Sequence, residues 1–529
     1  MGDKILDKFA TLFSVLFSIF IIYTVLLITF AAPISGYFSN DSLFSSWYLY
    51  IISAFLLVAI LIFLSMKFLS KPFNNVILQN NILNKYKENI ILAFILILSI
   101  ILRVIWVNTL YVIPQSDFEL YHSLAAELAK GRVSFNDYIA LFPHVIGYPA
   151  ILSLFYKAFG ASVIVAQLLN IAFNGGIIIL LYMVGKRLMN NTCGIVAALF
   201  WAFWPSQIFY NSLVSTESSF TFFMLICILV TIIVLQMKRS YKMTFLLFSI
   251  IGILCALTNA IRPFGMILII AIIMYYLLVF KEKLFSAKLW YIKCIFCATM
   301  ILSYTLTFNF ISIAISHTIN REVAKSPIGF TTLAGSNLNA SGGWNKEDSE
   351  FFGELSNKHG LTAQQVHDIA LHKAIERFRA QKFQNLVLIF YKHSGMWLLD
   401  NDPLWFINSG LDKSNQPKFD LSESFCTLDI LSNFYYYVML MLCGFCGVLI
   451  VRKYKTTNLE ENSIVFIFII VLGIVGAHLI FERSTRYHYP AVALFALIAS
   501  YGLTLYNKVK RTEKEHVEAD LEEKVVVIK

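Results

Sequence analysis

The residues that could support chemistry begin with an acidic residue, Asp117, just beyond the end of a long apolar run. Ser116 and Glu119 have the spacing of a capping box, and Gly131 is a plausible helix end, so the sequence predicts a helix of about four turns. Asp117 would lie in the first turn, where the helix dipole stabilises its charged form. Such a carboxylate can accept a proton from a substrate hydroxyl. The alternative interpretation is that Asp117 only caps the helix.

Cationic residues gather near the carboxyl end of the chain, in the segment FERSTRYHYP. Arg483, Arg486 and His488 lie there at the start of an apolar run, together with Tyr487 and Tyr489. Arginine forms bidentate contacts with phosphate, and the start of a helix favours anions, so this segment predicts a phosphate site. An interfacial anchor is the alternative, because Arg, His and Tyr are also common at the ends of membrane spans.

Four other polar residues follow less specific patterns. Arg103 lies near the middle of an apolar run, where a charge is costly and a functional or inward-facing position is expected. His144 precedes a short apolar segment and could contact phosphate or sugar, although a single loop histidine often does neither. Glu217 and Arg262 lie near the ends of apolar runs, and snorkelling toward water is the simplest explanation of both.

No cofactor motif is present in the sequence. It contains no GxxxxGK[ST] loop, no GxGxxG after a strand and no HExxH, so neither nucleotide hydrolysis nor a common zinc hydrolase is indicated. Asp117, Glu119, His122 and His144 could bind a metal but lack a specific ligand spacing. We therefore assign no metal site and no cofactor; a divalent metal is compatible with the sequence but not required. An activated lipid with a phosphate leaving group would supply the energy for a reaction.

The elements that position these residues are membrane helices. Hydrophobic residues make up 58% of the chain and charged residues only 14%, whereas about a quarter of the residues of soluble domains are charged. The net charge of +10 comes from short Lys/Arg clusters between apolar runs, which is typical of cytoplasmic loops and not of nucleic-acid binding. The eight cysteines fall mostly inside apolar runs, so a disulfide framework is not expected.

Twelve apolar windows are long enough to be candidate spans. With the amino terminus inside, the basic clusters all fall on the cytoplasmic side, provided that the short run 145–159, which contains Pro149, does not cross the membrane. The outer face would then collect the loop 114–161, the turn 259–262, the segment 316–427 and the loop 482–486, so that four separate segments could meet there. The windows are 9–31, 46–68, 89–113, 162–184, 192–210, 218–237, 243–260, 263–280, 289–315, 428–451, 463–481 and 486–506.

The order of several segments resembles a known superfamily. SDFELYHSLAAELAKG, LFPHVIGYPAILSLFYKAFG, GKRL, STESSFTFF, NAIRPFG and ERSTRYHYP follow one another along the chain. Together they resemble the GT-C membrane glycosyltransferases, in particular the bacterial branch related to protein O-mannosyltransferases and the lipid A aminoarabinose transferase. The similarity runs from about residue 89 to 506. It implies an all-α polytopic membrane fold with about 12 transmembrane helices, extracytoplasmic juxtamembrane helices and a small extracytoplasmic segment.

The resemblance also implies roles for individual residues. Asp117 falls on the position of the catalytic Asp in the first outer loop, and Tyr121 on that of a Tyr four residues later. Many relatives have Asp-Glu together, whereas Phe118 follows Asp117 here, which weakens any role that needs adjacent carboxylates. His144 lies near the position of a basic residue, and Arg486 resembles the arginine at the start of a late span. The candidates for binding the donor phosphate or sugar are Arg486, His144, Arg103, Tyr121, His488 and Tyr487.

The resulting hypothesis is an integral-membrane glycosyltransferase. It would transfer a monosaccharide, with inversion, from a polyprenyl-phosphate donor to an extracytoplasmic acceptor, which could be a cell-wall polymer, a glycolipid or a protein. Membrane lipid and this donor would be its partners, and the site would face outward from a multi-pass position in the plasma membrane. The alternatives are a flippase for lipid-linked saccharides, whose transport path Arg103 would mark, and a polysaccharide polymerase or ligase.

Five parts of the chain are expected. Two extra spans and a cytoplasmic loop would precede a catalytic membrane core that includes the first outer loop, 114–161. An extracytoplasmic segment, the carboxyl-terminal spans and a charged cytoplasmic tail would follow. The boundaries are 1–88, 89–315, 316–427, 428–506 and 507–529.

Overall fold

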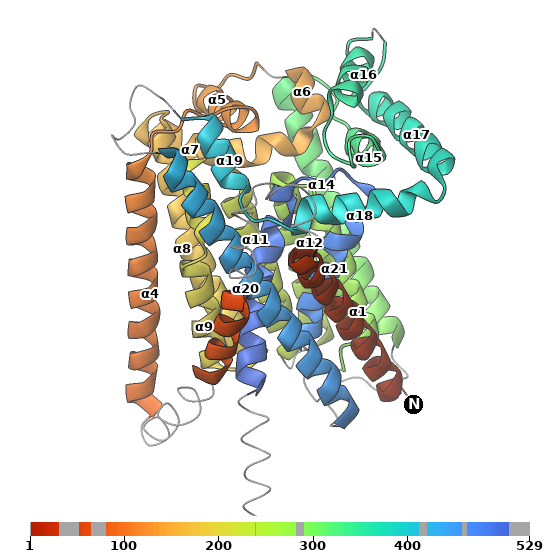
Figure 1. Ribbon diagram of the computed structural model, residues 1–529. Helices are drawn as coiled ribbons and strands as arrows, with labels where there is room; N and C mark the ends of the chain where they lie inside the picture. Colours follow the sequence, from red (N-terminus) through yellow and green to blue (C-terminus); the bar gives the residue numbers. More distant parts are fainter. Residues whose placement is uncertain are drawn as a thin grey trace, which may run out of the picture.

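The computed structural model describes a bundle of long helices with a group of shorter helices at one end (Figure 1). The short helices lie at the end of the bundle opposite the amino terminus. Within the described residues the secondary structure is helical, apart from one isolated bridge between Val112 and Leu411. The expected tail 507–529 lies outside those residues. The described residues are 2–30, 52–64, 81–134, 136–237, 240–281, 290–358, 360–411, 421–456 and 463–506.

Nine helices in this part of the chain are long and apolar enough to cross a membrane, and the helical membrane fold is confirmed. Eight of the nine are α1 (Gly2–Phe30), α4 (Asn81–Thr109), α8 (Val163–Leu188), α11 (Glu217–Gln236), α12 (Tyr241–Ile261), α14 (Trp290–Ile319), α20 (Leu421–Thr456) and α21 (Ser463–Ile480). The ninth is the final helix, residues 489–506, which lies in the span Thr485–Tyr506.

The other three predicted spans take different forms. The window 192–210 is a bent pair, α9 (Asn191–Ala202) and α10 (Pro205–Phe209), with a 61° bend at the break before Pro205. The windows 46–68 and 263–280 contain shorter helices, Ile52–Leu64 and α13 (Gly265–Leu278). Each of these is shorter than the roughly 20 residues needed to cross the hydrocarbon layer. All twelve apolar windows therefore contain helix, and among the described residues nine hold a single helix of spanning length.

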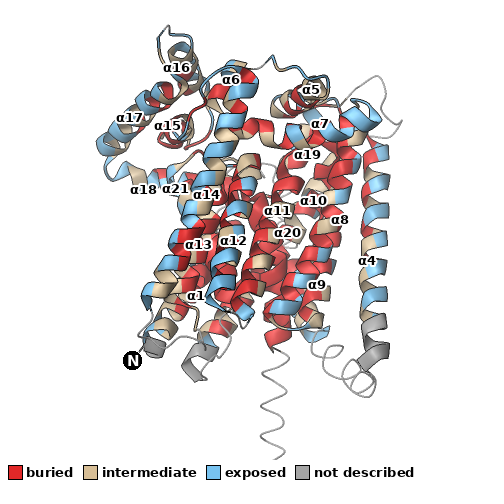
Figure 2. Ribbon diagram, turned by 180° about the vertical axis from the view of Figure 1, so that it is seen from behind, coloured by how far each residue is buried: buried red, intermediate tan, exposed pale blue. Residues whose placement is uncertain are grey.

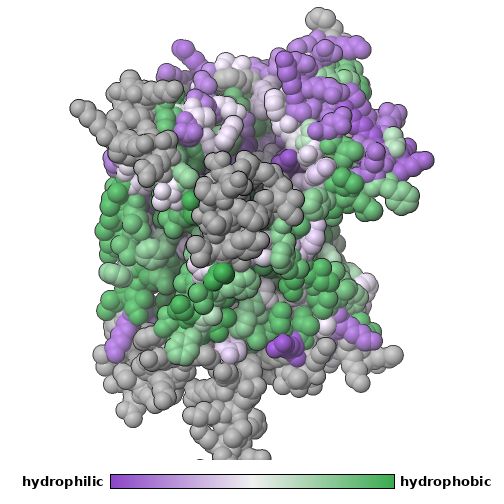
Figure 3. Space-filling view, viewed as in Figure 1, coloured by the Kyte–Doolittle hydropathy of each residue, from purple (hydrophilic) through white to green (hydrophobic). Residues whose placement is uncertain are grey.

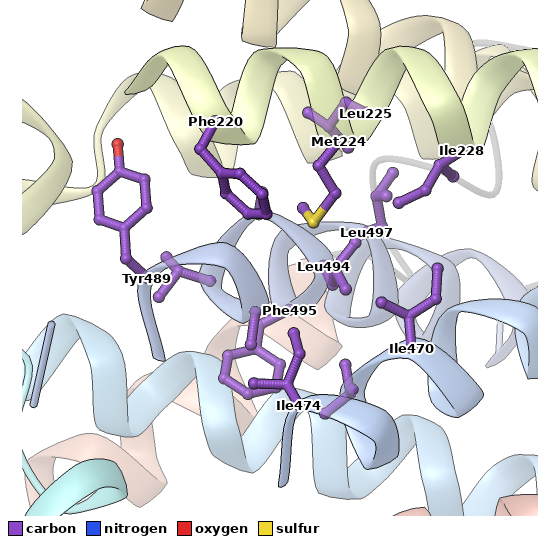
Figure 4. Packing of buried hydrophobic residues seen from close by; sticks show 14 of the residues in the cluster. Phe220, Met224, Leu225, Ile228, Ile470, Ile474, Tyr489, Leu494, Phe495 and Leu497 are labelled. Carbon is purple, nitrogen blue, oxygen red and sulfur yellow. The ribbon is translucent and has the colours of Figure 1, made fainter. Parts of the chain in front are cut away.

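The final helix forms the centre of the bundle. Residues 491–499 are each 0% exposed. Phe495 and Leu494 of this helix lie among Phe220 and Met224 of α11 and Ile474 of α21 (Figure 4). Because the helix is enclosed by other helices, its outer end at residues 485–488 is held in a fixed position.

Other helices lie at the edge of the bundle and meet lipid. Ile90, Phe94 and Ile97 of α4 are exposed, and α4 stands apart along one side (Figure 2). The surface shows a broad hydrophobic belt, while hydrophilic residues cover α16 and α17 at one end (Figure 3). This distribution is that of a protein with one large polar face outside the bilayer.

The short helices at this end of the bundle come from the loop after α4 and from the segment after α14. The predicted short piece 145–159 is α7, a 13-residue helix below spanning length that packs against α5. Thr362 and Gln365 form a capping box at the start of α17. The bounds are α5 (Asp117–Ala129), α6 (Asn136–Leu141), η1 (Pro143–Ile146), α7 (Gly147–Phe159), α15 (Gly329–Gly335), α16 (Lys346–Ser356), α17 (Ala363–Gln381), α18 (Gln384–Trp397) and α19 (Asp402–Ser409).

Two glycines allow close contacts that the site depends on. A Cβ at Gly194 of α9 would lie 2.3 Å from the carbonyl oxygen of Tyr182, so α8 and α9 approach as closely as small residues allow in a membrane. A Cβ at Gly147 would lie 2.0 Å from the carbonyl oxygen of Ala260. This second contact brings the start of α7 to the end of α12, two residues before Arg262.

Gly194→Val should destabilise the bundle by about 1–3 kcal/mol, because the new side chain has no space against the backbone of α8. A fall in the melting temperature of the purified protein in lipid nanodiscs would measure this. Gly476→Ala in α21 is the matched control, since nothing lies within 4 Å of its Cβ position. Equal melting temperatures for Gly194→Val and wild type would contradict the close packing.

Candidate active site

Asp117 is the first residue of α5, as the sequence predicted, but the predicted capping box is not formed. Ser116 makes no side-chain hydrogen bond to the helix, and its backbone has φ 54° and ψ −129°. An N-cap residue normally adopts an extended backbone, so this conformation does not present the Ser116 hydroxyl to the first turn. A positive φ at a residue other than glycine is strained, and such strain often occurs at functional sites.

One face of α5 is apolar and buried. Phe118, Tyr121, Leu124 and Ala125 are buried. They face other parts of the protein, because α5 packs against α7 and the ring of Phe118 makes an edge contact with Phe406 of α19. This buried face therefore fixes the helix, and Asp117 with it, onto α7 and α19.

Arg486 forms an ion pair with Asp117, with 2.5 Å between Nη2 and Oδ2. The guanidinium comes from the 3-10 turn η4 (Thr485–His488) and is 13% exposed, whereas Asp117 is 37% exposed. The rings of Phe118, Phe406 and Tyr487 lie 5.8–5.9 Å from the guanidinium carbon. Sequence analysis assigned a base role to one residue and phosphate binding to the other, and the structure places them in direct contact.

A second ion pair joins Glu217 and Arg262, at 3.1 Å between Oε1 and Nη2. Their side chains are 1% and 8% exposed, so the snorkelling explanation is wrong for both. The two charges neutralise each other at the outer ends of α11 and α12 instead of reaching water. Arg262 also lies over the ring of Tyr487, at 5.9 Å, and its Nη1 has no hydrogen-bond partner among the described residues. Tyr487 therefore lies between the arginines of the two pairs.

His144 lies in η1, on the same outer face. Its Nδ1 is enclosed and makes no hydrogen bond within the described part of the chain. Burial lowers the pKa of His144 to about 4, and the nearby charge of Arg262 lowers it further, while Asp117 opposes the shift. The imidazole is therefore neutral at physiological pH and can carry one N–H donor.

Tyr121 is buried four residues after Asp117, and its ring makes an edge contact with Tyr148 of α7 at 6.1 Å. Burial raises the pKa of Tyr121, and the negative charge of Asp117 raises it further. The phenol therefore stays protonated and can donate a hydrogen bond near Asp117.

Arg103 is not brought into contact with this cluster. It is 0% exposed, and it donates hydrogen bonds to the carbonyls of Trp201 and Ala202 and to Ser99. These carbonyls end α9 at the break before α10, where a cation complements the helix dipole. The hydrogen bonds of Arg103 therefore support the bent pair of helices.

His488 also has structural partners. Its Nδ1 donates to the carbonyl of Met396 at 2.7 Å, and its Nε2 lies 3.1 Å from Asp400. Asp400 in turn accepts hydrogen bonds from Trp204 and Ser206. Both ring nitrogens of His488 are therefore occupied, and the residue ties η4 to the segment between α18 and α19.

Two carboxylates near the site were missed by sequence reasoning. Burial raises the pKa of Asp402 in α19 to about 6 against the effect of Arg486, and Tyr210 donates a hydrogen bond to it. Glu482 is buried four residues before Arg486. Only its place in the charged segment FERSTRYHYP could have drawn attention to it. Within the described chain, no group of three His, Cys, Asp or Glu side chains is arranged to hold a metal ion.

Comparison with protein families gives one match, to the model of the dolichyl-phosphate-mannose-protein mannosyltransferases, over residues 143–308. The match confirms the resemblance to GT-C glycosyltransferases. It covers the chain from η1 into α14 and includes His144, Glu217 and Arg262, whereas Asp117 and Arg486 lie outside it. No curated protein sequence matches the chain significantly.

Two solved membrane-protein structures are similar to the chain at low identity. The archaeal oligosaccharyltransferase AglB from Archaeoglobus fulgidus, in complex with an inhibitory peptide and a dolichol-phosphate, has 13% identity and a TM-score of 0.45 over 83% of this chain and 52% of that one. ArnT from Cupriavidus metallidurans, bound to undecaprenyl phosphate, has 9% identity and a TM-score of 0.32 over 77% of each chain. The present chain spans about half the length of the archaeal enzyme.

Glu217→Gln should destabilise the fold by about 3–5 kcal/mol, because it leaves the buried charge of Arg262 without its partner. Thermal unfolding in nanodiscs would measure the loss. Glu322→Gln is the control, since it breaks an exposed pair with Lys325 and should change stability by less than about 1 kcal/mol. Equal effects of the two substitutions would contradict a buried, mutually dependent pair.

Proposed function

We propose that this chain is an integral-membrane glycosyltransferase. It transfers one sugar from a polyprenyl-phosphate donor to a hydroxyl group of an acceptor on the outer face, with inversion at the anomeric carbon. The observation that carries the proposal is the Asp117–Arg486 ion pair, next to a second arginine whose Nη1 is unpartnered. A base and cations for a departing phosphate are the groups that such a transfer needs.

Two buried nitrogen atoms on the described residues are available for the donor phosphate. Arg262 has its Nη1 without a partner, and His144 has its Nδ1 without one. Leaving such groups unsatisfied is costly, so both are suited to a ligand that accepts hydrogen bonds. Their electrostatic influence on each other indicates that they lie in one neighbourhood. The phosphate would lie against Arg262 and His144, with Arg486 as a further cation.

Asp117 would act as the base. The acceptor oxygen attacks the anomeric carbon while the bond from that carbon to the phosphate oxygen breaks, and the hydroxyl proton passes to Asp117. The phosphate leaves with one more negative charge, which Arg486 and Arg262 stabilise. Arg486 is also the counter-ion of Asp117 before the substrates bind. Because Asp117 is the more exposed partner of the pair, it is the carboxylate that an acceptor can reach.

The segment from α15 to α19 would help to select the acceptor. It is attached to the loop before Arg486, because the N–H of Glu482 donates to Thr331 and the N–H of Arg483 donates to Gly342. An acceptor bound on this segment would thus be held at a fixed distance from the ion pair. A cell-wall polymer, a glycolipid and a protein all remain acceptor classes, and the site would face outward from the plasma membrane.

A flippase is the alternative function. In the sequence, this function was suggested by Arg103, which could mark a transport path. The hydrogen bonds from Arg103 to the carbonyls at the end of α9 explain the buried position of this arginine without such a path. No other observation favours it.

Asp117→Asn should reduce transfer of labelled sugar from synthetic polyprenyl-phosphate monosaccharides by about 100-fold or more, because the amide cannot accept the proton. The assay uses purified protein in lipid with a crude envelope acceptor. Asp137→Asn is the matched control, since Asp137 is an exposed carboxylate of the same outer loop. Full activity of folded Asp117→Asn would exclude the base role.

The double variant Glu217→Gln/Arg262→Gln removes the second pair as a unit and should fold better than Glu217→Gln alone. We expect its affinity for polyprenyl phosphate to fall by about tenfold or more, since the arginine at the phosphate site is lost. The melting temperature of each protein in nanodiscs, measured at increasing concentrations of polyprenyl phosphate, would give the affinity. Unchanged affinity would place the phosphate elsewhere.

A further inference from the structure

Glu482 is a buried carboxylate that the mechanism above does not use. It is 7% exposed, and its side chain forms no hydrogen bond or ion pair with any residue that the structure describes. Neither of its carboxylate oxygens is among the fully enclosed atoms that lack a partner, so the carboxylate keeps a small contact with solvent.

The backbone of Glu482 is fixed on both sides. Its N–H donates to the carbonyl of Thr331 at 2.7 Å, and its own carbonyl accepts a hydrogen bond from Nδ1 of His478 at 2.9 Å. The first contact ties the residue to α15 and the second to α21. Because the backbone is held at both ends, the region that the side chain can reach is restricted.

The charged groups around Glu482 come from several elements. Asp117 lies on α5, Lys392 on α18 and Arg486 on η4, while Arg483 is its neighbour in the chain. Burial raises the pKa of Glu482 to about 7 and Asp117 raises it further, while Arg486, Lys392 and Arg483 lower it. The carboxylate is thus within electrostatic range of the Asp117–Arg486 pair.

The three cations near Glu482 have other hydrogen-bond partners. Lys392 donates to the carbonyls of Gly335, Leu479 and Ile480. Arg483 contacts the carbonyls of Ser341 and Gly395, and Arg486 contacts Asp117. A buried carboxylate without a hydrogen-bond donor destabilises the fold, so its presence beside the ion pair points to a donor that arrives with a ligand.

We propose that Glu482 binds a hydroxyl group of the sugar that the lipid donor carries. This inference rests on the proposed function and assigns the sugar side of the same site. A carboxylate repels phosphate and accepts hydrogen bonds from hydroxyl groups, so Glu482 complements the sugar, while Arg262 and His144 complement the phosphate. The acceptor hydroxyl would bind at Asp117, the more exposed carboxylate.

Binding of two lipids in nanodiscs, without acceptor, tests the proposal. Glu482→Gln should bind a polyprenyl-phosphate monosaccharide about tenfold more weakly than wild type and bind polyprenyl phosphate without a sugar equally well. A series of donors, each lacking one hydroxyl group of the sugar, would locate the contact. One of these donors should have the same affinity for wild type as for Glu482→Gln. Glu350→Gln, an exposed carboxylate of α16, is the control and should bind both lipids as wild type does.

A change of pH gives a second readout. As the pH falls from 8 to 6, Glu482 gains a proton, so the affinity of wild type for the sugar-bearing lipid should fall toward that of Glu482→Gln. The affinity of Glu482→Gln should change less over this range. If Glu482→Gln does not fold, Glu482→Asp serves instead, because it keeps the charge on a shorter side chain. This variant should lower the affinity for the sugar-bearing lipid only.

The outcomes separate the two proposals. Equal binding of the sugar-bearing lipid by wild type and Glu482→Gln overturns the role of Glu482 and leaves the glycosyltransferase proposal intact. If Glu482→Gln binds both lipids more weakly by the same factor, the role of Glu482 is also overturned, since the residue would then act on the phosphate or on the fold. If wild type binds neither lipid and transfers no sugar, the proposed function fails and the inference fails with it.

Discussion

The ion pair between Asp117 and Arg486 joins residues 369 positions apart and holds the outer face together. Asp117 begins α5, which packs on α7, and Arg486 precedes the buried final helix. The aromatic rings around the guanidinium come from α5, α19 and η4, so the same contact fixes three elements. If the pair were absent, a carboxylate would remain on a short helix and a guanidinium would remain at a span end, with no direct contact to align them.

The membrane helices could be predicted from the sequence because apolar length and basic loops are local properties. Each of the twelve apolar windows contains helix. The capping box at Ser116 was wrong, because the chain enters α5 with a positive φ that no local pattern indicates. Whether an apolar helix is complete or broken depends on packing and on residues such as Pro205, which ends one helix and begins another.

The residues of the site could be predicted more easily than their contacts. Asp117 and Arg486 were both chosen as candidates, but sequence spacing carries no information on the contact between them. Glu217 and Arg262 were each explained alone as snorkelling residues, since only the packed bundle shows that they neutralise each other. Glu482 was overlooked because burial without a partner is a property of the fold.

The position of Arg486 also has a consequence for biosynthesis. Membrane helices enter the bilayer in chain order, and the guanidinium is carried just before the last of them. Until that helix has been inserted, Asp117 has no counter-ion and the buried centre of the bundle is missing. The ion pair is thus completed only after that helix has been inserted, so a chain truncated before the helix would have the Asp117 carboxylate but not its counter-ion.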